Sequence, residues 1–228
     1  MGKQSIIFLG SKQIGYECLE YLIAESRQLD LHIQGILCNE NSGSSALYNL
    51  KKLASDHGIT VMAHPDVIPE TDILYSVQYH KILTHTQIAK AKQIALNLHM
   101  APLPEYRGCN QFSFAIIDEK KEFGTTIHQL DERIDHGGIL FEKRFAVPEN
   151  CWIDELYKMT YQASLQLFKE TLPKIANGEY TITSQQSLEQ QRGTCLHYRN
   201  EINALKEIDL NWSAEKIIKH IRATSMPG

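Results

Sequence analysis

QIALNLHMAPLPEYRG, residues 93–108, combines an apolar run with a proline-containing loop. Its first part, 93–99, is mostly apolar and predicts a buried strand. The strand runs directly into a loop whose prolines stiffen the exit. Asn97 and His99 are two positions apart, so on a strand their side chains project to the same side. Because open α/β sheets bind their ligands at the carboxyl ends of the strands, we expect a polar site where this strand ends.

Upstream of this stretch, strand and helix patterns alternate. Short apolar runs predict strands at 5–9, 31–37, 59–62 and 72–79. Helical spacing predicts helices at 14–25 and 84–92, and a further helix that opens at a loop or cap, 41–44, and ends at Gly58. This alternation is typical of an α/β fold with a doubly wound, mostly parallel, Rossmann-like sheet.

Downstream, the pattern changes at Gly124. Residues 124–130 and 139–147 predict the strands of a hairpin around the loop DERIDHGG, and 153–175 predicts a long amphipathic helix. The later chain is polar and ends in a weaker predicted helix, 214–222. We therefore expect a main domain over 1–180 and a short C-terminal extension over 181–228.

Composition excludes several classes of function. The formal net charge is −4 and the pI is near 6.2, so there is no broad basic field for binding nucleic acid. The cysteines are odd in number and form no C-x-x-C pair, which favours free thiols in a reducing compartment. No apolar run reaches the length of a membrane span, and the histidines lack metal-ligand spacing. We expect a cytoplasmic protein without a membrane, nucleic-acid or metal partner.

Three polar features carry candidate chemistry. The amide of Asn97 can donate to an oxyanion, and a neutral His99 can accept a proton near pH 7. Asp135 lies in the loop IDHGGI, where an Asp-x-Gly is most often only a turn. If the fold brings Asp135 beside His99, the carboxylate would hold the tautomer of the imidazole. Arg107 offers a forked donor for phosphate or carboxylate, although a surface arginine is an equal alternative.

In their order along the chain, Asn97-Leu98-His99, LPEYRG and Asp135-His136-Gly137 resemble the formyltetrahydrofolate-dependent formyltransferases. The form APLPEYRGCNQ is most similar to the branch that acts on dTDP-linked 3- or 4-amino-dideoxy sugars. The resemblance implies 10-formyltetrahydrofolate as co-substrate, the sugar amine as acceptor and no metal. It also implies a homodimer that takes part in the synthesis of a surface glycan, such as the O-antigen of lipopolysaccharide. The segment Ile221-Arg222-Ala223-Thr224 is similar to one after which the family continues, so we expect a shortened chain.

The same resemblance implies roles for individual residues. Asn97 would stabilise the oxyanion, and Asp135 would orient His99 and relay a proton. His99 would act either as the general base or, protonated, as a second oxyanion donor. The folate positions are Tyr79, Lys81, Leu83, Asp131, Glu132 and Ile134, and the nucleotide-sugar positions are Ser11, Lys12, Arg107 and Asn110.

Several of these residues could instead have purely structural roles. Tyr79 and Leu83 suit a plain core equally well, and Ser11 and Lys12 suit an ordinary strand-to-helix turn. His128, inside a predicted strand, is more typical of a hydrogen-bonded structural histidine. Other possible functions are formylation of another amine such as glycinamide ribonucleotide, binding of folate or nucleotide without catalysis, and a Rossmann-type oxidoreductase. The last is disfavoured because the loop after the first strand lacks G-x-G-x-x-G.

Overall fold

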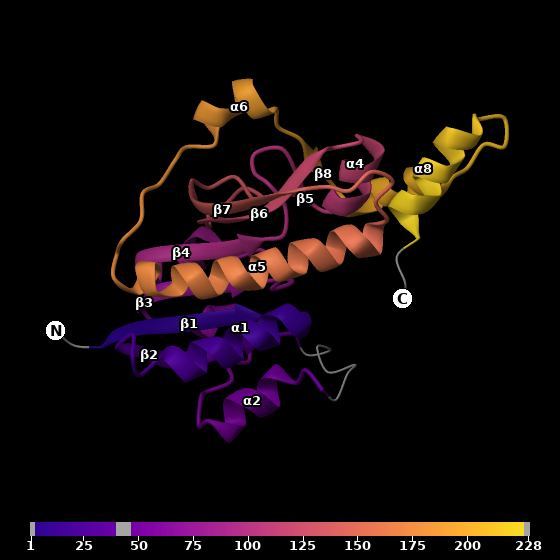
Figure 1. The fold of residues 1–228 in the computed structure, drawn as a ribbon. Helices are drawn as coiled ribbons and strands as arrows, with labels where there is room; N and C mark the ends of the chain where they lie inside the picture. Colours follow the sequence, from indigo (N-terminus) through magenta and orange to yellow (C-terminus); the bar gives the residue numbers. More distant parts are fainter. Residues whose placement is uncertain (1–2, 40–46, 226–228) are drawn as a thin grey trace.

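A six-stranded sheet forms the centre of the computed structural model, which describes residues 3–39 and 47–225 (Figure 1). The strand order is β2-β1-β3-β4-β6-β7. The strands are β1 (Gln4–Gly10), β2 (Leu31–Cys38), β3 (Thr71–Val77), β4 (Ala91–His99), β6 (Glu122–Gln129) and β7 (Ile139–Ala146). The first four are parallel, whereas β6 and β7 are antiparallel additions beside β4. The expected mostly parallel α/β sheet is confirmed.

One face of the sheet is covered by long helices. Figure 1 shows α1 (Lys12–Glu25) and α5 (Ile153–Ala176) lying across it. Alternate residues of the strands point toward these helices, and Phe8 and Tyr75 pack their rings against Phe168 of α5. The other face carries a smaller apolar cluster, closed by η1 (Pro65–Val67), α3 (His85–Ile88) and the segments around them. The site described below lies on this second face.

Some predicted elements differ from the structure. The strand expected at 59–62 is wrong, because only Val61 forms an isolated bridge, to Ile36. The helix expected at 84–92 is limited to α3, and β4 already begins at Ala91. The predicted cap at 41–44 lies outside the described residues. Within them, α2 (Leu50–Asp56) is capped by Asn49, whose side chain accepts from the Lys52 N–H.

The segments around the prolines build a second, smaller core. Helix α4 (Gln111–Ile117), which the sequence patterns did not predict, packs with the start of α5 and with α8 (Ala214–Thr224). Tyr106 and Phe123 are buried at its centre. The remaining elements are β5 (Arg107–Gly108), α6 (Gln186–Arg192), β8 (Leu196–His197), η2 (Arg199–Glu201) and α7 (Ile202–Lys206).

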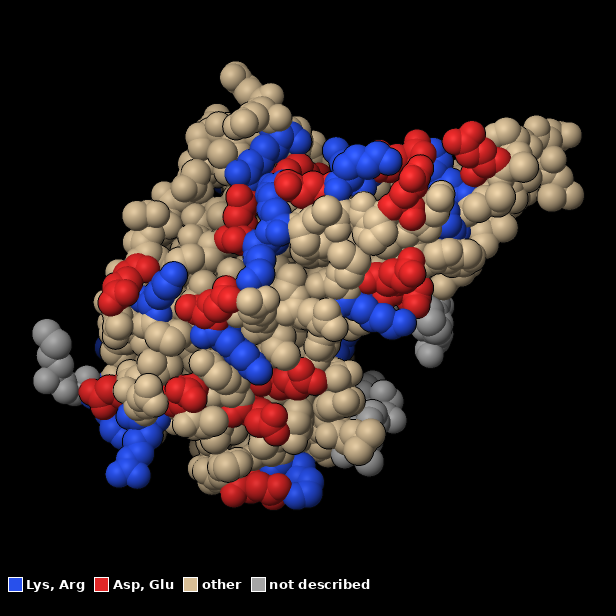
Figure 2. Space-filling model, viewed as in Figure 1, with Lys and Arg blue, Asp and Glu red and all other residues tan. Residues whose placement is uncertain are grey.

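The surface carries both signs of charge. Figure 2 shows basic and acidic side chains interspersed over the face that α1 and α5 cover, which agrees with the small net charge. Among the described residues, no helix combines the length and the apolar character needed to cross a membrane.

Candidate active site

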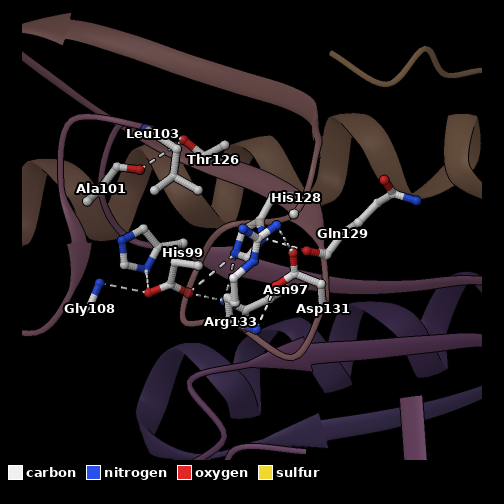
Figure 3. A network of polar contacts seen from close by, with 12 residues as sticks. Asn97, His99, Ala101, Leu103, Gly108, Thr126, His128, Gln129, Asp131 and Arg133 are labelled. Atoms are coloured by element: carbon white, nitrogen blue, oxygen red, sulfur yellow. Dashed lines mark hydrogen bonds and ion pairs between the residues drawn. The ribbon is translucent and has the colours of Figure 1, made fainter. Parts of the chain in front are cut away.

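Asn97 and His99 lie at the carboxyl end of β4, as the sequence predicts. The neighbouring residues Leu96 and Leu98 point into the core beneath α5, so Asn97 and His99 point to the opposite face. Strand β6 runs antiparallel beside them and places His128 opposite Asn97 and Thr126 opposite His99. Directly paired residues share a face, so four polar side chains gather at this edge. Figure 3 shows Asn97, His99 and His128 converging there.

Asp135 is brought into this cluster from the loop between β6 and β7. Its Oδ2 accepts a hydrogen bond from the Gly108 N–H at 2.9 Å and lies 3.5 Å from Nδ1 of His99. Its Oδ1 lies 3.4 Å from Nε2 of His128 and accepts from the Asn97 amide at 3.5 Å. The backbone φ of Asp135 is +46°, a left-handed conformation that is uncommon for a residue with a side chain. The three residues named from the sequence therefore meet at one point.

The surroundings keep Asp135 ionised. Burial by itself raises the pKa of a carboxyl group, and Asp135 is largely enclosed. The charge of His99, the hydrogen bond and charge of His128, and the Gly108 N–H outweigh burial and hold the pKa of Asp135 well below its usual range. The site therefore contains a desolvated carboxylate across neutral and mildly acidic pH.

The two ring nitrogens of His99 face two different oxygen atoms of the site. Nε2 lies 2.7 Å from the backbone oxygen of Tyr106, and Nδ1 faces the Asp135 carboxylate. Both partners are acceptors, and the contact of Nδ1 with the carboxylate, at 3.5 Å, is an ion pair only when the ring is protonated. His99 is also buried, with 5% of its surface exposed. Both roles named from the sequence, the general base and the protonated oxyanion donor, stay predictions.

His128 is a polar group of the site that sequence patterns missed. Its Nδ1 lies 2.7 Å from the backbone oxygen of Gln129, and its Nε2 lies 3.2 Å from the Asn97 amide nitrogen. The ring is therefore hydrogen-bonded, as predicted for a structural histidine, but its partners belong to the candidate site. His128 could have been predicted only from the pairing of β4 with β6, because a residue directly opposite Asn97 on an antiparallel strand lies on the same face of the sheet.

The proline loop is held over the sheet edge by its own contacts. Thr126 donates to the Ala101 carbonyl and accepts from the Leu103 N–H. The hydroxyl of Tyr106 donates to Asp118 at 2.6 Å, and burial together with this bond raises the pKa of Tyr106. Arg144 of β7 pairs with Glu105 at 2.8 Å. The peptide bond between Leu103 and Pro104 is cis. The loop thus presents the Gly108 N–H to Asp135 from a supported position.

The residues named for folate lie in two segments near this cluster. Leu83 is buried in the apolar cluster of the second sheet face, and Tyr79 is half-buried against the same cluster. Asp131 accepts from the Arg133 N–H at 2.9 Å and lies 3.2 Å from Nδ1 of His136. Lys81 and Glu132 are exposed, and Ile134 is half-buried.

The residues named for the nucleotide sugar surround the first strand-to-helix loop and β5. Ser11 is buried and its hydroxyl donates to the Gln78 carbonyl, whereas Lys12 donates to the Gln78 side chain at 3.1 Å. The Nε of Arg107 is buried and, among the described residues, no protein group bonds to it. The amide nitrogen of Asn110 donates to the carbonyls of Tyr198 and Arg199.

Arg199 is a basic residue near this loop that sequence patterns missed. Although Lys12 is exposed, the surrounding protein desolvates its ammonium group and lowers its pKa. Arg199 lowers that pKa further, while Cys109 opposes the shift. Two cations are therefore placed near one another, and an anion beside them would relieve their repulsion. Nothing local in the sequence around Arg199 links it to a residue so far upstream.

The chain is similar to proteins of one known family. A family model described as formyl transferase matches residues 50–172, which is more than half of the chain.

Among the described residues, no group of His, Cys, Asp and Glu is arranged to hold a metal ion.

Two curated proteins and one solved structure are similar to this chain. A bifunctional polymyxin resistance protein ArnA of Wigglesworthia glossinidia brevipalpis is 33% identical over 68% of this chain, although the match spans only 23% of ArnA. A GDP-perosamine N-formyltransferase of Brucella melitensis biotype 1 is 26% identical over 92% of this chain and 80% of its own length. The crystal structure of WlaRD, a sugar 3N-formyl transferase with dTDP and 5-N-formyl-THF, has a TM-score of 0.83 at 22% identity and covers 99% of this chain and 81% of its own. That last likeness shows a shared fold.

Proposed function

Because the chain belongs to the formyl transferase family, we propose that it moves a formyl group from 10-formyltetrahydrofolate to the amine of a nucleotide-linked 3- or 4-amino-dideoxy sugar. The observation that carries the proposal is the convergence of Asn97, His99 and Asp135 at the carboxyl end of β4. Such a group can stabilise an oxyanion and move a proton, which are the requirements of acyl transfer to an amine.

Support for a sugar acceptor comes from the relatives. The Brucella protein is named for GDP-perosamine, and the WlaRD crystals held dTDP with a formyl-folate. The loop form APLPEYRGCNQ favours a dTDP-linked sugar. A GDP-linked sugar is the nearest alternative, and glycinamide ribonucleotide is the alternative outside the sugar class.

In the proposed mechanism, the lone pair of the sugar amine attacks the formyl carbon and a tetrahedral intermediate forms. The Asn97 amide donates to the developing oxyanion, a contact worth about 3 kcal/mol of the barrier when well aimed. The imidazolium of His99, held between the Tyr106 carbonyl and Asp135, adds positive charge beside that oxygen. Asp135 takes the proton lost by the attacking nitrogen, directly or through water, and returns it to the folate nitrogen as the carbon–nitrogen bond breaks.

The binding positions follow the same proposal. We expect the pteridine to lie between the segment Tyr79 to Leu83 and the loop 131–138, recognised mainly by backbone groups. The diphosphate would lie near Lys12 and Arg199, where an anion offsets the mutual repulsion of two cations. Arg107 has an unsatisfied buried Nε that suits the same ligand, and Asn110, beside Arg199, would face the sugar.

The cellular setting belongs to the proposal as well. We expect a cytoplasmic homodimer that supplies formylated sugars for lipopolysaccharide or another surface glycan. A cytoplasmic site fits the free cysteines, which are stable as thiols in a reducing compartment.

Incubation with 10-formyltetrahydrofolate and a panel of acceptors tests the function. The panel contains dTDP-, GDP- and UDP-linked amino sugars and glycinamide ribonucleotide, and product is detected by the mass gain of one formyl group. We expect turnover of a dTDP-linked amino sugar and its loss in His99→Ala. Turnover of glycinamide ribonucleotide alone would overturn the sugar assignment.

Two further outcomes would point to another class. Binding of folate and nucleotide without turnover of any acceptor would indicate a non-catalytic relative. Thermal stabilisation by NAD or NADP, with none by folate, would indicate an oxidoreductase.

A further inference from the structure

Gln185 donates both hydrogens of its side-chain amide into the turn that carries Asp135. Its Nε2 lies 2.9 Å from the carbonyl oxygen of Asp135 and 2.8 Å from that of Gly137. Gln185 is 2% exposed, so these bonds are sheltered from water. Figure 1 shows how the chain reaches this place: after α5 it rises along one edge of the sheet and continues to α6, at the top of the view.

The turn needs such support because its backbone is unfavourable by itself. Asp135 has a φ of +46°, and a residue with a side chain in this region costs about 1–3 kcal/mol. Gly137 passes so close to the Gln129 carbonyl that an added Cβ would collide with it. A carbonyl buried without a donor costs a further ~1–3 kcal/mol. The bonds from Gln185 therefore stabilise a conformation that aims the Asp135 carboxylate.

The position of Gln185 is set by the segment around it, residues 183–197, which we call the strap. On one side, Thr183 exchanges two backbone hydrogen bonds with Ile139 of β7, each 2.8 Å long. Farther along, Arg192 makes two bonds to the Glu142 carboxylate, at 2.8 and 2.9 Å, and one to the Leu103 carbonyl. Bidentate pairing of this kind fixes geometry as well as charge.

On its other side, the strap pairs with the proline loop. The Arg107 N–H donates to the Cys195 carbonyl and the Cys109 N–H to the His197 carbonyl, both at 2.9 Å. Between these bonds lies Gly108, whose N–H donates to Asp135. The strap therefore supports Asp135 twice: Gln185 holds its backbone, and the pairing of β5 with β8 presents the N–H that holds its carboxylate.

We propose that Gln185 is a positioning residue for the formyl transfer, acting through Asp135 without contact to substrate; this inference rests on the proposed function. A carboxamide is suited to the task because one uncharged nitrogen offers two donors. A carboxylate at this position would face two carbonyl oxygens and could donate to neither. The strap, which lies beyond the predicted boundary at 180, then contributes a residue to the site.

The test compares Gln185→Met, which keeps length but removes both donors, with Gln186→Met at the exposed next position as the matched control. We expect Gln185→Met to lower kcat by about tenfold to 100-fold, the range that a misplacement of about 1 Å can cause. The KM for the sugar should stay within about twofold, because Lys12 and Arg199 are untouched, whereas the KM for 10-formyltetrahydrofolate rises if the loosened loop 131–138 binds the pteridine. If Gln185→Met fails to fold, the near-isosteric Gln185→Glu takes its place.

A double-mutant cycle separates positioning from general support of the fold. In an Asp135→Asn background, Gln185→Met should lower kcat little further, because its effect passes through the lost carboxylate. Equal losses in both backgrounds, or a kcat of Gln185→Met within twofold of wild type, would overturn the proposal.

Amide hydrogen exchange in the loop 131–138 gives a readout that needs no activity. We expect faster exchange there in Gln185→Met than in Gln186→Met. If the wild-type protein formylates no sugar but this difference is present, the proposed function fails while the structural role of Gln185 stands. Unchanged exchange would contradict the role itself.

Discussion

Replacing Asp135 by Asn tests the centre of the proposed mechanism with a minimal change of shape. The substitution exchanges one carboxylate oxygen for an NH₂ group, so it removes the charge and adds two donors. In the wild-type protein the carboxylate accepts from the Gly108 N–H and the Asn97 amide, and it lies within 3.5 Å of the rings of His99 and His128. The variant therefore places an NH₂ group among groups that already donate.

The size of the effect follows from these contacts. Hydrogen bonds to a charged group contribute about 1.5–3 kcal/mol each, so loss of charge weakens the hold on His99 and Asn97. The variant also lacks the proton acceptor, and general acid–base catalysis is typically worth about 10²–10⁴-fold in rate. We expect kcat to fall by about 10²–10⁴-fold. The KM for the sugar should change by no more than about threefold, since the positions proposed to bind it are unaltered, and saturating 10-formyltetrahydrofolate removes any change in its own KM from the comparison.

The assay is steady-state formation of the formylated sugar at saturating 10-formyltetrahydrofolate. Asp72→Asn is the matched control, because Asp72 also accepts two hydrogen bonds, from the N–H and the hydroxyl of Ser5, and its pKa is likewise lowered by them. It lies at the amino end of β3, away from the site. A kcat for Asp135→Asn within threefold of wild type would refute the reasoning, as would an equal loss in the control.

Three further predictions concern stability and the strap. Phe168→Ala should lower the free energy of unfolding by about 3–5 kcal/mol in urea titrations, because its fully buried ring packs against Tyr75; a loss below 1 kcal/mol would contradict this packing. Gly108→Ala should separate β5 from β8 and reduce kcat, because φ is +85° and a Cβ would meet the His197 carbonyl; full activity with native stability would argue against it. Since the pKa of Asp135 is lowered on folding, its contribution to stability is complete above the unfolded value of about 3.9 and is lost as pH falls toward the folded value. The pH dependence of urea unfolding between pH 5 and 3 should therefore be shallower in Asp135→Asn than in wild type, by at most ~1.4 kcal/mol per pH unit, and identical slopes would contradict the shift.

Several features follow from local sequence because their causes are local. The apolar run before Asn97 forms β4, and the two-residue spacing to His99 puts both side chains on one face, since strand periodicity depends only on backbone geometry. The long helix α5 agrees with its predicted range to within a residue at its end, because an amphipathic pattern of that length has few alternatives.

Short elements were harder to predict because pairing and packing decide them. The mostly apolar residues 59–62 have the pattern of a strand, but only Val61 forms a β-bridge, to Ile36, so the segment is not a strand of the sheet. Residues 84–92 divide between α3 and β4, since pairing with β3 begins at Ala91. Helix α4 is held by contacts with α5 and α8 that lie far along the chain.

The amino-acid sequence by itself determined the α/β sheet, the location of the site at the end of β4 and, through the resemblance, the three residues proposed for catalysis. Which groups surround these three residues depends on the folded chain. His128 joins the site through strand pairing, and Gln185 reaches Asp135 across 50 residues of chain. Hydrogen bonds of this range depend on the final fold, and no local periodicity reports them. The Gly108 N–H that donates to Asp135 and the Tyr106 carbonyl that faces His99 are likewise products of the closed loop and not of any motif.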